Sequence, residues 1–117
     1  MRRDVYHYFQ QAYRRQLPPL SSPLRFVDED GLQAAFAISV CGVGRIERVD
    51  YRCTTCVTLV ALCEHVAEQL SGATLQEARA LDAGQLLELH PEIPAGRRSR
   101  AHLALNAARA ALETFPS

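Results

Sequence analysis

The sequence predicts an α+β fold, with a three-stranded antiparallel meander packed against helices in one domain covering residues 1–117. Residues 32–41 alternate strictly between two sets of side chains, as a half-buried strand does. Residues 4–16 repeat apolar side chains at three- and four-residue intervals, as an amphipathic helix does. Beyond residue 53 helical patterns follow one another without a further strand. Strands and helices are therefore segregated along the chain.

The first quarter of the chain predicts a helix, a loop and a short strand. The helix at 4–16 is stopped by a pair of prolines at 18–19, whose rings cannot continue it. A loop at 21–23 follows. A first strand at 24–27 then leads into an acidic turn at 28–31, which ends in glycine.

The next two strands are predicted to form a hairpin. The strand at 32–41 reaches a tight turn at 42–44, where two glycines flank a valine, and a third strand covers 45–52. The apolar positions of this third strand break the alternation once, which predicts a β-bulge. Its inward-facing residues are Ile46, Val49 and Tyr51.

The remaining chain predicts several helices. Thr54 or Thr55 is the expected N-cap of a helix that runs to about Leu70, where serine and glycine end it. Thr74 and Glu77 form a capping-box pattern at the start of a short helix. A further helix covers 82–89, a loop with two prolines covers 90–100, and the last helix covers 100–114.

Composition limits the class of protein. The 13 basic and 13 acidic residues cancel, which disfavours an electrostatic nucleic-acid binder. No apolar run approaches the length of a membrane span, and no apolar stretch follows Arg2 and Arg3 as in a signal peptide. We therefore expect a cytoplasmic protein without nucleic-acid or membrane partners. In that compartment the 4 cysteines stay reduced.

Two of the cysteines are expected to be core residues. Cys41 ends the second strand, so the whole third strand, roughly 25 Å, separates it from Cys53. Cys63 lies in an apolar stripe of the long helix. It is ten positions beyond Cys53, about 15 Å along a helix axis, so we expect it to lie apart from that cysteine.

Cys53 and Cys56 form a Cys-x-x-Cys pair at the junction of strand and helix. Cys53 is expected beside the positive end of the helix, which favours the reactive thiolate. Cys56 is either a core residue or the second thiol of the pair. No second pair of cysteines or histidines at metal-ligand spacing accompanies them.

Two further residues are candidate ligands near Cys53. In a meander, the turn between the first two strands lies at the end where the third strand stops. Asp30 in that turn is either an oxygen ligand or part of a solvated turn. His102, near the start of the last helix, is either a ligand or a surface histidine.

Three motifs occur in a set order: "YRC" at 51–53, "SGATLQEA" at 71–78 and "RAHLALNAARAAL" at 100–112. In this order they resemble the IscU/NifU N-terminal family, the iron–sulfur cluster assembly scaffolds. The resemblance runs from residue 24 to 112, about three-quarters of the chain. It implies an IscU/NifU-like fold.

The resemblance also implies a binding site. Members of the family hold a 2Fe–2S cluster or zinc with three cysteines, and Cys53 matches the second of them. Asp30 falls near the first cysteine, and Arg100 or Ser99 falls at the third. The cofactor-binding residues implied here are Cys53, Cys56 and Asp30, with His102 as a further metal ligand. The cofactor is then a 2Fe–2S cluster, iron or zinc, unless the site is vestigial and holds none.

The predicted function is therefore not that of an enzyme. The chain is expected to be a divergent cluster assembly scaffold-like protein that binds iron, sulfur or a cluster through Cys53, or that docks assembly partners. Those partners are a cysteine desulfurase, a recipient protein or a second copy of the chain. Two alternatives stay open: a metal-free degenerate paralogue acting as a protein-interaction module, and a small thiol redox protein using Cys53 and Cys56.

Overall fold

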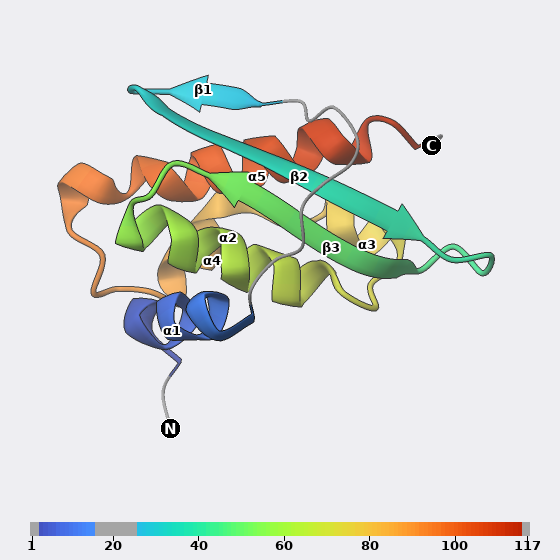
Figure 1. The fold of residues 1–117 in the computed structure, drawn as a ribbon, viewed down its shortest axis with the longest axis horizontal. Coiled ribbons are helices and arrows are strands. Elements are labelled where there is room, and N and C mark those ends of the chain that lie inside the picture. Colours follow the sequence, from blue (N-terminus) through green and yellow to red (C-terminus); the bar gives the residue numbers. More distant parts are fainter. Residues whose placement is uncertain (1–2, 16–25, 116–117) are drawn as a thin grey trace.

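Helices and strands are segregated along the chain in the computed structural model, which describes residues 3–15 and 26–115 (Figure 1). One helix is followed by three strands, and helices make up the rest, so the predicted α+β class is confirmed. The elements are α1 (Val5–Arg15), β1 (Val27–Glu29), β2 (Leu32–Val40), β3 (Ile46–Cys53), α2 (Val57–Leu70), α3 (Leu75–Arg79), α4 (Ala83–Glu88), the 3-10 helix η1 (Ala95–Arg97) and α5 (Ser99–Leu112).

The three strands form the predicted antiparallel meander in the order β1-β2-β3. The first turn is shorter than expected, because Asp28 and Glu29 belong to β1 and pair with β2. Only Asp30 and Gly31 form the turn, and both have positive φ, 55° and 77°. An Asp-Gly pair suits a two-residue hairpin of this kind. The predicted proline stop at 18–19, the loop at 21–23 and Leu24 lie outside the described residues.

The predicted bulge is confirmed in β3. Ser39 pairs with Arg48, whereas Val40 pairs with Ile46, so Glu47 is the extra residue. The bulge explains how Ile46, buried beyond it, and the residues that alternate after it all reach the same core. The register also pairs Ala34 with Cys53 and carries β2 on toward Cys41.

Helices α2 and α5 cover the sheet, with α2 under β3 and α5 under β2 and β1 (Figure 1). The sheet contributes Phe36, Val49 and Tyr51 to the core. The two helices contribute leucines, alanines, Val66 and Cys63, all almost completely buried. Burying such side chains supplies most of the free energy that favours folding.

The predicted caps of α3 and of the end of α2 are confirmed, but the predicted cap at the start of α2 is wrong. Thr74 and Glu77 form the complete predicted capping box at α3, and Ser71 is the C-cap of α2. The N-cap of α2 is Cys56, not Thr54 or Thr55. The hydroxyl of Thr54 instead accepts the backbone N–H of Gln33 (2.9 Å), which ties the chain after β3 to β2.

Helix α1 packs on α2 through an aromatic and polar cluster (Figure 1). The Tyr8 ring stacks on that of His65, with ring centres 4.1 Å apart. His65 Nδ1 lies 2.7 Å from Nε2 of His90, and both histidines are buried. Nδ1 of His90 lies 3.2 Å from Glu92, whose carboxylate also accepts the backbone N–H of Val5 (2.9 Å) at the start of α1.

In the described part of the chain, no helix has both the length and the apolarity that crossing a bilayer requires.

Candidate functional site

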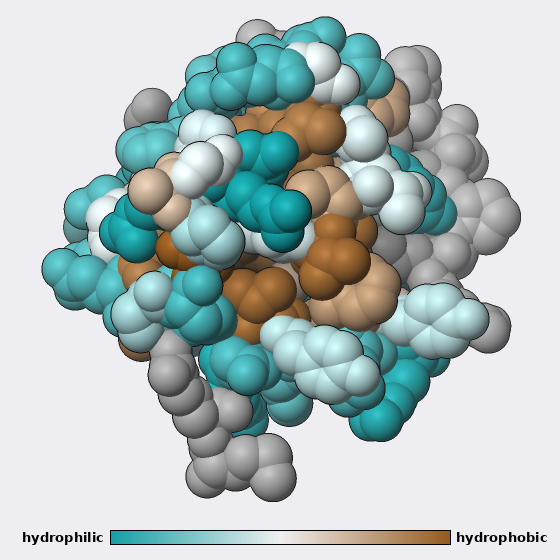
Figure 2. All heavy atoms as spheres, turned by 90° about the vertical axis from the view of Figure 1, so that its left-hand side faces the viewer, coloured by the Kyte–Doolittle hydropathy of each residue, from teal (hydrophilic) through white to brown (hydrophobic). Residues whose placement is uncertain are grey.

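Four segments meet at one end of the molecule, on the left in Figure 1: the β1–β2 turn, the end of β3, the start of α2 and the start of α5. Figure 2 looks onto this end and shows apolar side chains at its centre among hydrophilic ones. Cys53, Cys56 and Arg100 belong to these segments. Cys41, beyond the other end of β2, does not, as the sequence predicted.

The Cys53 side chain interacts with Cys63, which corrects the expectation that the two lie apart. A hydrogen bond from the Cys63 thiol stabilises the Cys53 thiolate and lowers its pKa, although burial opposes this. The expectation counted residues along one helix, but Cys53 belongs to β3, and α2 passes beneath that strand. A direct contact across the strand–helix interface is the result.

Cys63 itself is completely buried on α2 and is part of the core, as the sequence predicted. Burial raises the pKa of its thiol well above the usual range, and the neighbouring Cys53 and Glu64 raise it further. At neutral pH Cys63 therefore keeps its proton. The two sulfurs form an asymmetric pair, with the thiol of Cys63 as hydrogen-bond donor and Cys53 as acceptor.

Cys56, rather than Cys53, stands at the positive end of α2. Burial opposes its ionisation, but the backbone amides of Leu59 and Thr58 and the guanidinium of Arg100 outweigh burial and lower the pKa of the Cys56 thiol. Both amides lie close enough to the sulfur to stabilise its thiolate, although neither forms a regular helix-capping hydrogen bond with it. The thiolate-favouring position that the sequence gave to Cys53 is thus occupied by Cys56.

Arg100 reaches Cys56 from the first turn of α5. Its Nη1 donates to the carbonyl of Gly96 (3.1 Å), which fixes the side chain across the start of the helix. Its Nε is buried and has no hydrogen-bond partner among the described residues. The resemblance put Arg100 or Ser99 at the position of the third family cysteine, and Arg100 places positive charge next to a thiol there.

The predicted oxygen and imidazole ligands do not complete a metal centre. Asp30 lies in the turn at the same end of the sheet as Cys53, as predicted. His102 is exposed on α5. Within residues 3–15 and 26–115, no three or more His, Cys, Asp or Glu side chains are grouped so that they hold a metal ion. The set Cys53, Cys56, Asp30 and His102 therefore does not fit a resident metal or cluster within one chain.

A groove of about 460 Å³ gives access to Cys53. We call it the thiol groove. Its walls come from α1, β3 and α2, and apolar and aromatic side chains predominate, with Arg52 as the charged residue. Its size is that of a site for a small molecule or a short peptide segment. The lining residues are Phe9, Ala12, Tyr13, Tyr51, Arg52, Cys53, Thr55 and Val60.

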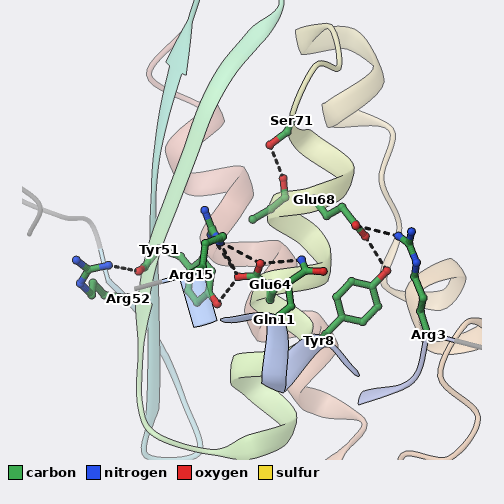
Figure 3. A network of polar contacts seen from close by, with 10 residues as sticks. Arg3, Tyr8, Gln11, Arg15, Tyr51, Arg52, Glu64, Glu68 and Ser71 are labelled. Carbon is green, nitrogen blue, oxygen red and sulfur yellow. Dashed lines mark hydrogen bonds and ion pairs between the residues drawn. The ribbon is translucent and has the colours of Figure 1, made fainter. Parts of the chain in front are cut away.

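A buried carboxylate fixes the strand and helix that carry the two sulfurs (Figure 3). Glu64 on α2 accepts the hydroxyl of Tyr51 on β3 at 2.8 Å. It also accepts Gln11 of α1 at 2.8 Å and forms an ion pair with Arg15 at 3.1 Å. Three elements are thus joined next to Cys63. Sequence reasoning missed Glu64, because a single acid in an apolar helix gives no sign of its partners.

Compared with known protein families and with curated proteins, the chain matches none. The IscU/NifU resemblance stays a prediction.

The geometry predicts which thiols react. We expect an alkylating agent to label Cys53 and Cys56 in the folded protein about tenfold or more faster than Cys63, because thiolate character and access set the rate. Mass-spectrometric mapping of labelled peptides over time measures this. In denaturant all four cysteines should label alike, and native labelling of Cys63 at the rate of Cys53 would contradict the assignment.

Proposed function

We propose that this chain is a non-enzymatic, IscU/NifU-like protein of iron–sulfur metabolism that carries sulfur on Cys53. The donor is a persulfide, such as that of a cysteine desulfurase, and the receiver is a cluster assembly or recipient protein. The observation that carries the proposal is the Cys53 thiol: it is stabilised as a thiolate by Cys63 and lines an accessible groove.

The transfer needs only what the site contains. The Cys53 thiolate attacks the outer sulfur of a donor persulfide, R–S–SH, and forms the Cys53–S–SH persulfide. The donor's sulfur–sulfur bond breaks and its electron pair leaves on the R–S⁻ thiolate. Thiol exchange of this type is fastest when the attacking thiol is partly ionised at ambient pH. A lowered pKa moves the Cys53 thiol toward that condition.

Sulfur is favoured over a resident metal because the ligand set of one chain is incomplete. Arg100 donates no lone pair and brings positive charge to the thiols. A persulfide anion, by contrast, gains from nearby positive charge. Iron, zinc or a 2Fe–2S cluster at Cys53, with Cys56 and Asp30, would need further ligands from a second copy or a partner.

Sulfur loading of variants in which one cysteine is replaced tests the proposal. We expect wild-type protein, treated with inorganic polysulfide without oxygen and quenched early, to gain one sulfur atom on Cys53, with any addition on Cys56 located separately by fragmentation of the peptide. Cys53→Ser should lose this addition and keep its thermal unfolding temperature, because a half-buried strand end contributes little to the core. Intact-mass and peptide mass spectrometry give the readout.

Cys41→Ser is the matched control, because it removes a half-buried thiol at the far end of the same hairpin. It should load as wild type does. Equal loading of Cys53→Ser and wild type would contradict the proposal and favour the protein-interaction module. The third candidate, a thiol redox protein, is supported by the contact of Cys53 with Cys63 rather than by the Cys53/Cys56 pair.

A further inference from the structure

The proposed function so far uses Cys63 only as a hydrogen-bond donor to Cys53, and no chemical step involves its sulfur. Cys53 packs against the core cluster that contains Cys63, where β3 lies on α2. Cys63 is completely buried, whereas Cys53 is half-buried and lines the thiol groove. Strand β3 and helix α2 are fixed next to the two sulfurs by the Tyr51–Glu64 hydrogen bond of 2.8 Å. An exposed acceptor thiol thus has a protected second thiol behind it.

We propose that Cys63 discharges the sulfur carried by Cys53, releasing it as sulfide and leaving a Cys53–Cys63 disulfide. This inference rests on the proposed function, since it requires a persulfide on Cys53. It makes the protein a converter of persulfide sulfur into free sulfide, the form that combines with iron. An external dithiol must then reduce the disulfide before a second sulfur is accepted.

The step balances without an added oxidant. The Cys63 sulfur attacks Sγ of the Cys53 persulfide and forms the new sulfur–sulfur bond. The bond between Sγ and the outer sulfur breaks, and its electron pair leaves on that sulfur. The proton of Cys63 passes to the departing hydrosulfide, giving H₂S. The outer sulfur is reduced, and the two cysteine sulfurs are oxidised to the disulfide.

Burial suits Cys63 to the second step, and its proton leaves as its sulfur attacks, because the thiolate is the nucleophile. A protonated, inaccessible thiol does not compete with Cys53 for the donor persulfide. It is held where the sulfur that it must attack is bound, so the reaction is intramolecular and gains from proximity. Cys56 is the other nearby thiol, but it faces the amides at the start of α2 and Arg100. We therefore assign the discharge to Cys63 and not to the Cys-x-x-Cys partner.

The experiment follows sulfur after one loading with inorganic polysulfide in the absence of oxygen. Wild type should pass from a Cys53 persulfide to a Cys53–Cys63 disulfide and release about one sulfide per chain. Cys63→Ala should keep the persulfide and release sulfide at least about tenfold more slowly. Cys56→Ser is the matched control and should behave as wild type. Sulfide assay and mass spectrometry of non-reduced peptides follow both products.

The outcomes separate the two proposals. A stable persulfide in wild type, or a disulfide that joins Cys53 to Cys56, would overturn the role of Cys63 and leave the carrier function intact. Wild-type protein that, quenched early, carries no sulfur on Cys53, forms no disulfide and releases no sulfide would overturn the carrier function, and this inference with it. Disulfide mapping in wild type needs no variant, so the test holds even if Cys63→Ala folds poorly. Untreated protein should show no disulfide.

Discussion

Replacing Glu64 by alanine is expected to lower the free energy of unfolding by about 3 kcal/mol. The carboxylate is buried and accepts hydrogen bonds from Tyr51, Gln11 and Arg15 (Figure 3). Its loss leaves the Tyr51 hydroxyl without a partner in the core and opens a cavity. Denaturant unfolding measures the change, and amide hydrogen exchange shows whether α1 and β3 are both released from α2.

Two matched variants separate this network from a general effect of removing an acid. Glu64→Gln keeps the size of the side chain and an acceptor oxygen for Tyr51, so it should cost only about 1 kcal/mol. Glu68→Ala removes the next acid on the same face of α2, where the side chain is 35% exposed, pairs with Arg3 and accepts the hydroxyl of Tyr8 at 2.7 Å. A partly exposed ion pair and one hydrogen bond contribute about 1 kcal/mol together. Equal decreases in the free energy of unfolding for Glu64→Ala and Glu68→Ala would show that the Glu64 hydrogen bonds add no particular stability.

The predictable part of this fold is the part encoded locally. The alternation of residues 32–41, the Asp30–Gly31 turn and the Thr74–Glu77 capping box each depend on neighbours within a few positions. Such patterns act before any tertiary contact forms. The N-cap of α2 was predicted wrongly because Thr54 and Thr55, which are common cap residues, precede Cys56. The hydroxyl of Thr54 instead accepts a hydrogen bond from the backbone N–H of Gln33 in β2. A contact between strands therefore decided a helix boundary.

The candidate site was predictable only in part, because it depends on packing between segments. Cys53 and its place at the strand–helix junction follow from the sequence. The partner thiol does not: a distance counted along α2 says nothing of how β3 crosses that helix. Arg100 was located by the resemblance, but its contact with Cys56 depends on where α5 begins. The histidines at 65 and 90 gave no signal, since the chain between them folds back before they meet.

That histidine pair predicts an acid-sensitive attachment of α1. His65 is 7% exposed, and burial, followed by the neighbouring His90, lowers the pKa of His65 from 6.5 to about 4. Arg3 and His7 act in the same direction, whereas Glu68 opposes them. Tyr8 of α1 covers the ring, and burial and Glu68 raise the pKa of its phenol to about 12, so Tyr8 stays neutral. Protonated His65 would carry its charge in this buried cluster, next to His90.

The sign of the pH dependence follows from the direction of that shift. Between about 4 and 6.5 the unfolded chain protonates His65 and the folded chain does not, so stability rises with pH across this window. The stabilisation is fully present above 6.5 and is lost as the pH falls toward 4, by at most about 3 kcal/mol. We expect His65→Gln, which bonds to His90 without titrating, to flatten this part of the stability curve. Denaturant unfolding at a series of pH values measures the change, with hydrogen exchange in α1 as the local readout.

His102→Gln, at an exposed position, is the control and should keep the wild-type slope. Because carboxylates titrate in the same range in every variant, only the difference between curves counts, and identical slopes for His65→Gln and wild type would remove His65 as the cause.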